Sequence, residues 1–273
     1  MTVNRFTTDS IPIDDRGLAY GDGLFETVRI NSSQTVLLDD HLKRLINGAD
    51  RLGIPLEQEQ LLLDIESLTP DFPENGVLKI ILTRGSGGRG YRPDVNTKSR
   101  IILSLHPLPD YGENADNGVS VFICQQRLAH QPSLAGIKHL NRLEQVMASR
   151  EWPEGDYMEG LMMDMEDNII EGTRSNIFWS DNGKLFTPDL SSCGVAGILR
   201  DTLLQNIPET EISNQSSVSE LVNADELFIC NSVFGAWPVK QILTEKGLVE
   251  INSLQTAGFT QRAKELFARL LEK

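Results

Sequence analysis

Lys138 is the side chain of this sequence best placed to attack a carbonyl carbon. It lies in the segment 134–144, where Asn141 and Glu144 have the spacing of a helix N-cap and its third residue. A helix is therefore predicted to begin at Asn141, with Lys138 just before it. The positive end of the helix dipole would lower the pKa of this amine and leave a neutral nucleophile near pH 7. Taken alone, the segment also fits a solvated surface lysine.

Three later segments carry groups that suit a bound anion or a charged ring. Glu171 leads into a strand of a β-rich region, where a carboxylate normally needs a partner, although an exposed strand end is an alternative. Gly194 and Gly197 open a predicted helix, and backbone N–H groups at a helix start suit a phosphate. Residues 230–235 close an apolar strand with small polar side chains that include Ser232. A plain helix start and a plain turn explain these two segments equally well.

A glycine-rich segment at 85–90 satisfies the pattern G-x-G-x-x-G after a predicted strand, with Asp110 twenty residues further on. A dinucleotide-binding fold needs a helix directly after these glycines, whereas residues 91–96 are rich in turn formers. A hairpin loop is the alternative. The loop is also a candidate for binding an anion, because it contains Arg84, Arg89 and Arg92, with Tyr91 beside them.

The first half of the chain alternates strand and helix signals. Residues 24–30 and 35–38 predict two strands around a turn, and Asp39 is the predicted N-cap of a helix that ends at Gly53. The remaining predicted elements are a helix at 57–68 and strands at 77–83 and 100–105. This order indicates an α/β sandwich.

The second half is dense in short strands. Residues 106–117 are rich in Pro, Gly, Asn and acidic side chains and predict a linker. Strands are predicted at 119–124, 160–164, 177–180, 184–187 and 226–230, and helices at 141–151, 197–206 and 260–271. These elements indicate a compact α+β domain that resembles a barrel.

Composition narrows the possible partners. The chain has 273 residues, enough for two domains, and a net charge of -14, which argues against nucleic acid or an anionic membrane as the main partner. No signal peptide, transmembrane helix or metal site is expected from the sequence. The three cysteines, Cys124, Cys193 and Cys230, form no C-x-x-C pair and predict buried, reduced thiols in a cytoplasmic protein.

In this order, the loop lysine, the acidic strand end, the glycine-led helix and the Asn-Ser turn resemble the fold-type IV pyridoxal-phosphate (PLP) enzymes. These form the branched-chain and D-amino-acid aminotransferase family. The resemblance begins at residues 15–29 and covers nearly the whole chain. Residues 84–91 and 136–145 look most similar to the corresponding segments of the aminodeoxychorismate lyases within that family.

The resemblance implies an α+β fold with an N-terminal α/β domain at 1–107, a linker at 108–117 and a β-rich PLP-binding pseudo-barrel at 118–273. It also implies a homodimer, with the cofactor site between the domains and near the dimer interface. The implied reaction converts 4-amino-4-deoxychorismate to p-aminobenzoate and pyruvate for folate biosynthesis. A D-amino-acid or branched-chain aminotransferase is the alternative, and a binding protein without catalysis is a more distant one.

Roles for single residues follow from the same resemblance. Lys138 matches the Schiff-base lysine and Glu171 the carboxylate that faces the pyridine nitrogen. Arg142 stands where the aminotransferases have a tyrosine, which is consistent with a different reaction. The matching phosphate contacts are Arg44, Gly197, Ile198, Leu199 and Ser232. Arg89, Tyr91 and Arg29 are the candidates for binding the dicarboxylate substrate, and Thr27 for assisting proton transfer.

Overall fold

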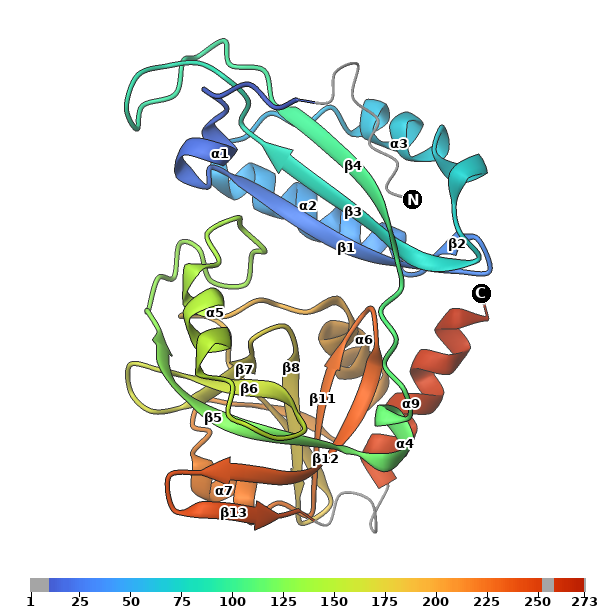
Figure 1. Ribbon diagram of the computed structural model, residues 1–273, viewed down its shortest axis with the longest axis vertical. Helices are drawn as coiled ribbons and strands as arrows, with labels where there is room; N and C mark the ends of the chain where they lie inside the picture. The colour runs from blue at the N-terminus through green and yellow to red at the C-terminus, as the bar shows by residue number, and fades with distance from the viewer. Residues whose placement is uncertain (1–9, 252–257, 273) are drawn as a thin grey trace. The chain divides into compact units, whose positions relative to one another are not determined.

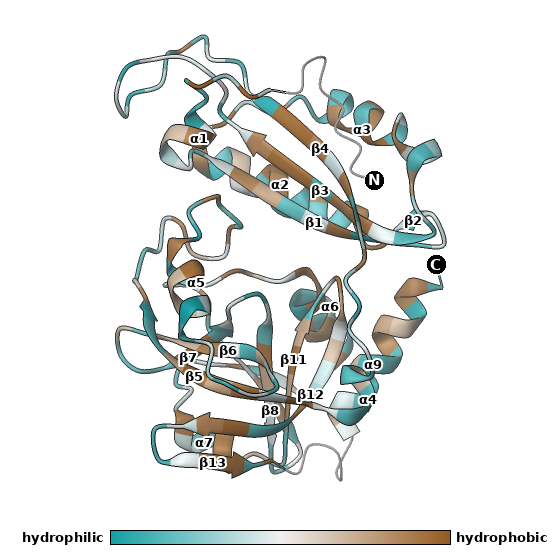
Figure 2. Ribbon diagram, viewed as in Figure 1, coloured by the Kyte–Doolittle hydropathy of each residue, from teal (hydrophilic) through white to brown (hydrophobic). Residues whose placement is uncertain are grey.

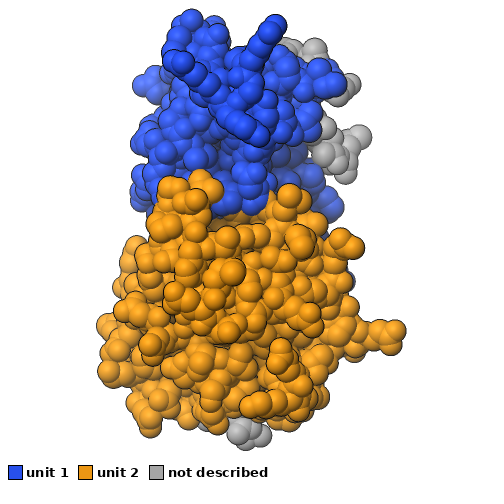
Figure 3. All heavy atoms as spheres, turned by 90° about the vertical axis from the view of Figure 1, so that its left-hand side faces the viewer, with its two compact units in different colours: residues 1–110, 137–141 blue, residues 111–136, 142–273 orange. Residues whose placement is uncertain are grey.

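The structure is a computed structural model that describes residues 10–251 and 258–272. The chain divides into two compact units, which Figure 3 shows in different colours. Unit 1 comprises residues up to 110 together with residues 137–141, and unit 2 comprises residues 111–136 and the chain from 142 onward. The domain limits expected from the sequence, with a linker at 108–117, stay a prediction.

Unit 1 is built on a four-stranded antiparallel sheet in the order β2-β1-β3-β4. Figure 1 shows α2 along one face of this sheet. The elements in chain order are α1 (Arg16–Tyr20), β1 (Gly23–Asn31), β2 (Gln34–Thr35), α2 (Leu38–Leu52), α3 (Gln58–Glu66), the 3₁₀ turn η1 (Thr69–Asp71), β3 (Asn75–Thr83) and β4 (Arg100–Pro107).

The apolar pattern of β1 and α2 explains how they pack. Buried residues alternate along β1, as period-two burial requires, and α2 turns its apolar stripe toward them. Gly48 lets α2 approach closely, because a Cβ there would lie 2.9 Å from a methyl carbon of Leu24. Most of β3 and β4 is brown, that is hydrophobic, in Figure 2.

The hairpin predicted from the strands at 24–30 and 35–38 is confirmed, but its second strand is shorter and begins one residue earlier than predicted. Strand β2 ends at Thr35, and α2 begins at Leu38, one residue before the predicted N-cap. Leu37 takes a left-handed backbone conformation with φ of 56° and turns the chain directly into the helix. The predicted helix end is confirmed, since Gly53 caps α2 with φ of 62°.

The glycine-rich segment is a hairpin loop between β3 and β4. These strands are antiparallel and no helix separates them, so the hairpin-loop interpretation is confirmed and the turn-rich residues 91–96 do not open a dinucleotide-binding helix. Gly85 has φ of 82°, and a Cβ there would lie 2.0 Å from the Lys98 carbonyl oxygen. Only glycine fits where the two arms of the loop meet.

Unit 2 contains a nine-stranded mixed sheet in the order β10-β9-β8-β11-β12-β5-β6-β7, with β13 paired to β12. Its elements are α4 (Asn114–Asn117), β5 (Val119–Leu128), α5 (Leu143–Ala148), η2 (Ser149–Glu151), β6 (Tyr157–Asp164), β7 (Ile169–Gly172), β8 (Asn176–Asp181), β9 (Lys184–Pro188), α6 (Ile198–Asn206), β10 (Thr210–Ser213), α7 (Val218–Val222), β11 (Glu226–Asn231), β12 (Gly235–Thr244), β13 (Gly247–Glu250) and α9 (Gly258–Leu271).

This sheet curls on itself. The edge strand β7 leads through only three residues into β8, which lies inside the sheet order, so the chain can join them only if the sheet bends round. Phe178 and Phe228, whose rings stack with centroids 5.1 Å apart, belong to a buried apolar cluster with side chains of α6 and α9. None of the helices in the described part of the chain is long and apolar enough to cross a membrane.

Candidate active site

Lys138 is positioned by the sheet of unit 1. Residues 137–141 run antiparallel along the edge of β1, where Leu24 pairs with His139. The Phe25 amide donates to the Lys138 carbonyl oxygen at 3.0 Å, and the Lys138 ammonium nitrogen Nζ lies 4.5 Å from the centroid of the Phe25 ring. The backbone and the aromatic ring together fix where this amine lies.

The helix predicted to begin at Asn141 starts two residues later. Helix α5 begins at Leu143 and its N-cap is Arg142, whose side chain makes no capping hydrogen bond. Asn141 instead donates to the Gly21 carbonyl oxygen at 3.1 Å, and the Glu144 carboxylate accepts from the Ala129 amide at 2.8 Å. The predicted helix start is therefore wrong, and the helix-dipole account of the Lys138 pKa has no structural basis.

A buried charged cluster lies on the side of β1 that faces α2. Arg44 donates from Nε to Glu26 Oε1 at 2.8 Å and from Nη2 to Oε2 at 2.5 Å. The nitrogen Nδ1 of His41 lies 2.6 Å from Glu26 Oε2. Burial alone would raise the pKa of Glu26, but the charge and hydrogen bonds of Arg44 and the hydrogen bond of His41 lower it to about 2. Arg44, a predicted phosphate contact, is thus held by an ionised carboxylate.

Sequence reasoning missed Glu26 and His41. The signal was present, since Glu26 occupies the apolar phase of β1 between Leu24 and Val28. Burial lowers the pKa of His41 although Glu26 opposes this, so the ring is neutral at pH 7 and Nδ1 carries the hydrogen donated to Glu26. Among the described residues, the buried nitrogen Nε2 of His41 has no hydrogen-bond partner.

The opposite side of the same sheet carries the predicted catalytic and substrate residues of β1. Directly paired residues of antiparallel strands point to the same side of a sheet, so the register shows which side chains share a face. We name the face that contains Phe25 the Lys138 face, because Lys138 lies over the Phe25 ring. It consists of Phe25, Thr27 and Arg29 from β1, Val77, Lys79 and Ile81 from β3, and Ile102, Ser104 and His106 from β4.

Glu171 lies in unit 2, on β7, with 4 % of its surface exposed. Its Oε2 accepts from the Val195 amide at 2.8 Å, and Gln145 Nε2 lies 3.5 Å from Oε1. Gly194 brings this backbone close, because a Cβ there would lie 3.3 Å from Glu171 Oε2. The predicted core position of Glu171 is confirmed, and the exposed strand-end alternative is wrong.

The glycine-led helix begins where it was predicted. Gly197 is the N-cap of α6, and a Cβ there would lie 1.9 Å from Asn176 Oδ1. No side chain caps this helix, and no group in the described part of the chain accepts a hydrogen bond from the amides of Ile198 and Leu199. Ser232 is buried in the turn after β11. The amides at the start of α6, which have no acceptor in the described part of the chain, are suited to a phosphate.

The predicted anion-binding loop divides into structural and exposed residues. Arg84 donates to Asp22 at 2.7 Å and to the carbonyl oxygens of Leu52 and Gly53 at the end of α2, so it is part of the fold. Arg16 holds the loop by donating to the carbonyl oxygens of Gly90 and Tyr91. Arg89 and Tyr91 themselves are exposed, Tyr91 by 88 %.

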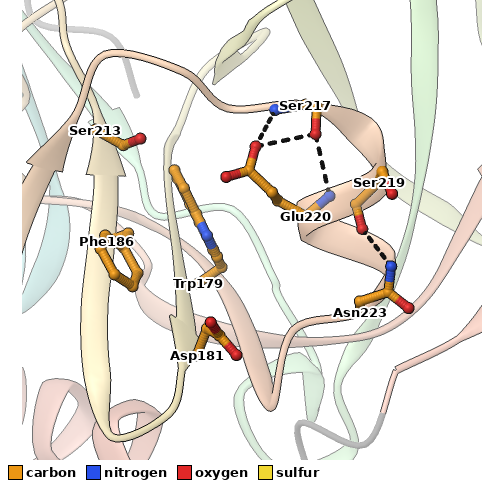
Figure 4. Close-up of a pocket in the computed structure, with 8 residues that line it drawn as sticks. All are labelled: Trp179, Asp181, Phe186, Ser213, Ser217, Ser219, Glu220 and Asn223. Carbon is orange, nitrogen blue, oxygen red and sulfur yellow. Dashed lines mark hydrogen bonds between the residues drawn. The ribbon is translucent and has the colours of Figure 1, made fainter.

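A pocket of about 300 Å³ in unit 2 is a separate feature (Figure 4). Some of its polar groups bond to each other: Glu220 accepts from Ser217, and Asn223 donates to the Ser219 carbonyl oxygen. Its lining includes no lysine or arginine and none of the predicted site residues: Trp179, Asp181, Phe186, Ser213, Ser217, Ser219, Glu220 and Asn223. This pocket is therefore unsuited to a phosphate or a dicarboxylate.

Comparisons with known proteins identify the family. The family model of amino-transferase class IV matches residues 23–242. The chain belongs to the amino-transferase class IV family. It is 32 % identical over 252 residues to an aminodeoxychorismate lyase of Vibrio harveyi, covering 91 % of this chain and 93 % of that protein. It is also 30 % identical over 270 residues to a putative branched-chain-amino-acid aminotransferase of Methanocaldococcus jannaschii, covering 96 % and 92 %.

A solved structure supports the same family at the level of the fold. The crystal structure of 4-amino-4-deoxychorismate lyase from Pseudomonas aeruginosa matches with a TM-score of 0.89 and 39 % identity, covering 98 % of each chain. The predicted fold-type IV architecture is thereby confirmed, and with it the expectation of an enzyme that uses PLP. Aminotransferases and lyases belong to the same family, so the family match by itself does not distinguish their two reactions.

The donor groups of this chain fit PLP. The aldehyde of PLP requires an amine, its pyridine nitrogen requires a carboxylate, and its phosphate suits a helix start whose amides lack an acceptor. Lys138, Glu171 and Gly197 provide them in turn. The assignment of single residues to the cofactor stays a prediction.

Proposed function

We propose that this protein is a PLP-dependent lyase that converts 4-amino-4-deoxychorismate to p-aminobenzoate and pyruvate in folate biosynthesis. The observation that carries the proposal is the full-length similarity to the Pseudomonas aeruginosa lyase. The sequences Arg84–Tyr91 and Gly136–Gln145, which resemble those of such lyases, support it independently of the fold.

Lys138 would form the Schiff base with PLP, and Glu171 would keep the pyridine nitrogen protonated. When bound, PLP supplies a ring that accepts electrons from the carbon bearing the substrate nitrogen. The proposed phosphate contacts are Arg44, Ser232 and the amides of Gly197, Ile198 and Leu199. Arg142, the N-cap of α5, is proposed to lie beside the cofactor where the aminotransferases have a tyrosine.

Lys138 also moves the proton in this proposal. Its Nζ, freed when the substrate amine replaces it on the cofactor, would remove the proton from the ring carbon that carries the substrate nitrogen. The bond between the neighbouring carbon and the enolpyruvyl oxygen then breaks, and the ring becomes aromatic. The enol of pyruvate takes up a proton from Lys138, which restores the amine. Thr27 lies on the Lys138 face two residues from Phe25, which supports a role in assisting this transfer.

We assign substrate binding to Arg29, Arg89 and Tyr91. Arg29 shares the Lys138 face with Phe25 and Thr27. Arg89 and Tyr91 lie in an exposed loop whose backbone Arg16 anchors. Guanidinium groups suit carboxylates because they form paired hydrogen bonds.

A homodimer and a cytoplasmic location belong to the same proposal. Helix α5 exposes three apolar side chains at helical spacing, Leu143, Val146 and Met147, and an exposed apolar stripe is typical of a protein interface. The three cysteines are buried and form no disulfide, which fits a reducing compartment.

The test uses the purified full-length protein loaded with PLP. We expect 4-amino-4-deoxychorismate to release pyruvate in the absence of any keto acid. Borohydride should fix PLP to the peptide that contains Lys138, and Lys138→Ala should abolish both the attachment and the reaction. Lys43→Ala, which removes an exposed lysine of α2, is the matched control.

The alternative is an amino-acid aminotransferase of the same family, which the Methanocaldococcus jannaschii relative favours. Such an enzyme would release no pyruvate from 4-amino-4-deoxychorismate and would require a keto acid as amino-group acceptor. That result would overturn the lyase assignment while leaving PLP dependence intact.

A further inference from the structure

Residues 194–197, which lie directly before α6 and are here named the glycine strap, connect two proposed cofactor contacts of unit 2. The Val195 amide donates to Glu171 Oε2 at 2.8 Å, and Gly197, two residues later, is the N-cap of α6. The strap therefore joins the proposed contact of the pyridine nitrogen to the proposed phosphate contact through a few backbone bonds. A group that fixes the strap would act on both contacts.

The side chain of Asn176 contacts the glycine strap at two points. Its Nδ2 donates to the Val195 carbonyl oxygen at 2.9 Å. The amide and the carbonyl of Val195 are thus both engaged, the first by a carboxylate and the second by the Asn176 amide. The other end of the Asn176 side chain lies against Gly197, where a Cβ would be 1.9 Å from Oδ1. One side chain therefore touches both the residue that binds Glu171 and the residue that begins α6.

Asn176 and the strap are both closely confined. Asn176 is 5 % exposed and is the first residue of β8, which has neighbouring strands on both sides, and it pairs with Cys230 of β11. Gly194 has φ of 85°, and a Cβ there would lie 2.9 Å from side-chain carbons of Ile170 and Leu190. Because the sheet fixes the backbone of Asn176, its amide sets where the strap lies.

From these contacts we infer that Asn176 is a positioning residue of the cofactor site, which aligns the Glu171 carboxylate and the start of α6 through the glycine strap. The inference rests on the proposed roles of Glu171 and Gly197 toward PLP. Removal of the amide takes away the donor that Asn176 supplies to the buried Val195 carbonyl oxygen. Since a buried carbonyl without a donor is costly, we expect the strap to shift and both contacts to weaken.

The first measurement is the Kd of PLP for the full-length protein freed of cofactor. Asn176→Ala should raise this Kd by about 10-fold, as expected for the loss of a buried hydrogen bond that aligns the site. Pyridoxal lacks the phosphate and reports on the ring contacts alone, so its affinity should fall as well. Unchanged affinity for pyridoxal would confine the effect of Asn176 to α6 and would overturn the inference.

The second measurement is the pH midpoint at which the visible absorption of bound PLP changes. A ring nitrogen that has lost its proton no longer repels a proton at the nitrogen that joins Lys138 to the cofactor, so displacement of Glu171 should raise the midpoint by about one pH unit. A loss of fold stability alone would not move it. Ser216→Ala is the matched control: it removes a buried hydrogen bond to the Ile169 carbonyl oxygen and should change neither the Kd nor the midpoint.

A double variant tests whether Asn176 acts through Glu171. In that case Asn176→Ala should add nothing to the midpoint shift that Glu171→Gln causes, whereas two shifts that add would contradict the inference. If Asn176→Ala does not fold, Asn176→Asp provides the test. It keeps the shape of the side chain beside Gly197, but an ionised carboxylate cannot donate to the Val195 carbonyl oxygen. It should weaken PLP binding by about 10-fold or more, and binding as tight as in the wild type would count against the role of Asn176.

The outcomes for this inference and for the proposed function are distinguishable. A wild-type protein that binds PLP but releases no pyruvate refutes the lyase assignment, and the Kd and midpoint of the Asn176 variants still decide the inference. A wild-type protein that releases pyruvate, together with an unchanged Kd and midpoint in Asn176→Ala, refutes only the role of Asn176.

Discussion

Replacing Glu26 by glutamine should destabilise unit 1 in a way that depends on pH. The carboxylate is buried and bonded to Arg44 and His41, and its pKa is lowered from 4.5 to about 2. This difference corresponds to roughly 3 kcal/mol of stability at neutral pH. Glu26→Gln leaves the guanidinium of Arg44 buried without its counter-charge, so a loss of about 3 kcal/mol is expected at pH 7.

The sign of the pH dependence follows from the direction of the shift. Because the folded protein holds Glu26 ionised below the pKa of the unfolded chain, its contribution is complete above pH 4.5 and disappears as the pH falls toward 2. About 1.4 kcal/mol should remain at pH 3. The gap in unfolding free energy between wild type and Glu26→Gln should therefore narrow by about half between pH 7 and pH 3.

Urea unfolding followed by far-ultraviolet circular dichroism at the two pH values measures this gap. Glu66→Gln, an exposed site at the end of α3, is the control and should change the free energy of unfolding by less than about 0.5 kcal/mol. A gap of equal size at pH 7 and pH 3 would refute the assignment of Glu26 as an ionised partner of Arg44.

Three further outcomes are expected. Glu171→Gln should retain PLP but lower kcat by about 100-fold or more in a pyruvate-release assay, because an amide does not keep the pyridine nitrogen protonated, and full activity would contradict the role of Glu171. Burial raises the pKa of Cys124 and of Cys193 to about 12, so a disulfide reagent at pH 8 should label them only after addition of urea, and rapid labelling of the native protein would show this burial to be wrong. Val146→Glu should halve the mass found by sedimentation, whereas an unchanged dimer would place the interface away from α5.

The periodic elements were predictable from the sequence because single patterns specify them. The alternation along β1 and the stripe of α2 with Gly53 at its end lie within a few residues of the observed limits. Strand β12 was missed, and it contains Gly235 and Pro238, which local propensity disfavours in a central strand. Pro238 nevertheless pairs with Phe228 because strands on both sides impose the conformation.

Site residues were predictable where neighbouring residues in the sequence determine their position, and not where contacts with distant residues do. Glu171 and the start of α6 follow from local turns and glycines. The placement of Lys138 depends on β1, which lies more than a hundred residues earlier in the chain. Asn141 does not cap the helix as predicted, because its side chain donates to the Gly21 carbonyl oxygen instead. No pattern within a short window contains these partners.

The return of residues 137–141 to unit 1 limits how this protein can be divided. A fragment that ends at residue 110 would keep β1 but lose the segment that covers its edge, leaving the Phe25 amide and the Gly23 carbonyl oxygen open to pairing with another chain. The complementary fragment would carry Lys138 without the Phe25 ring that fixes it. The two units are thus not interchangeable modules, and recombination between relatives would have to exchange two separate stretches of chain to move unit 1 intact with its lysine.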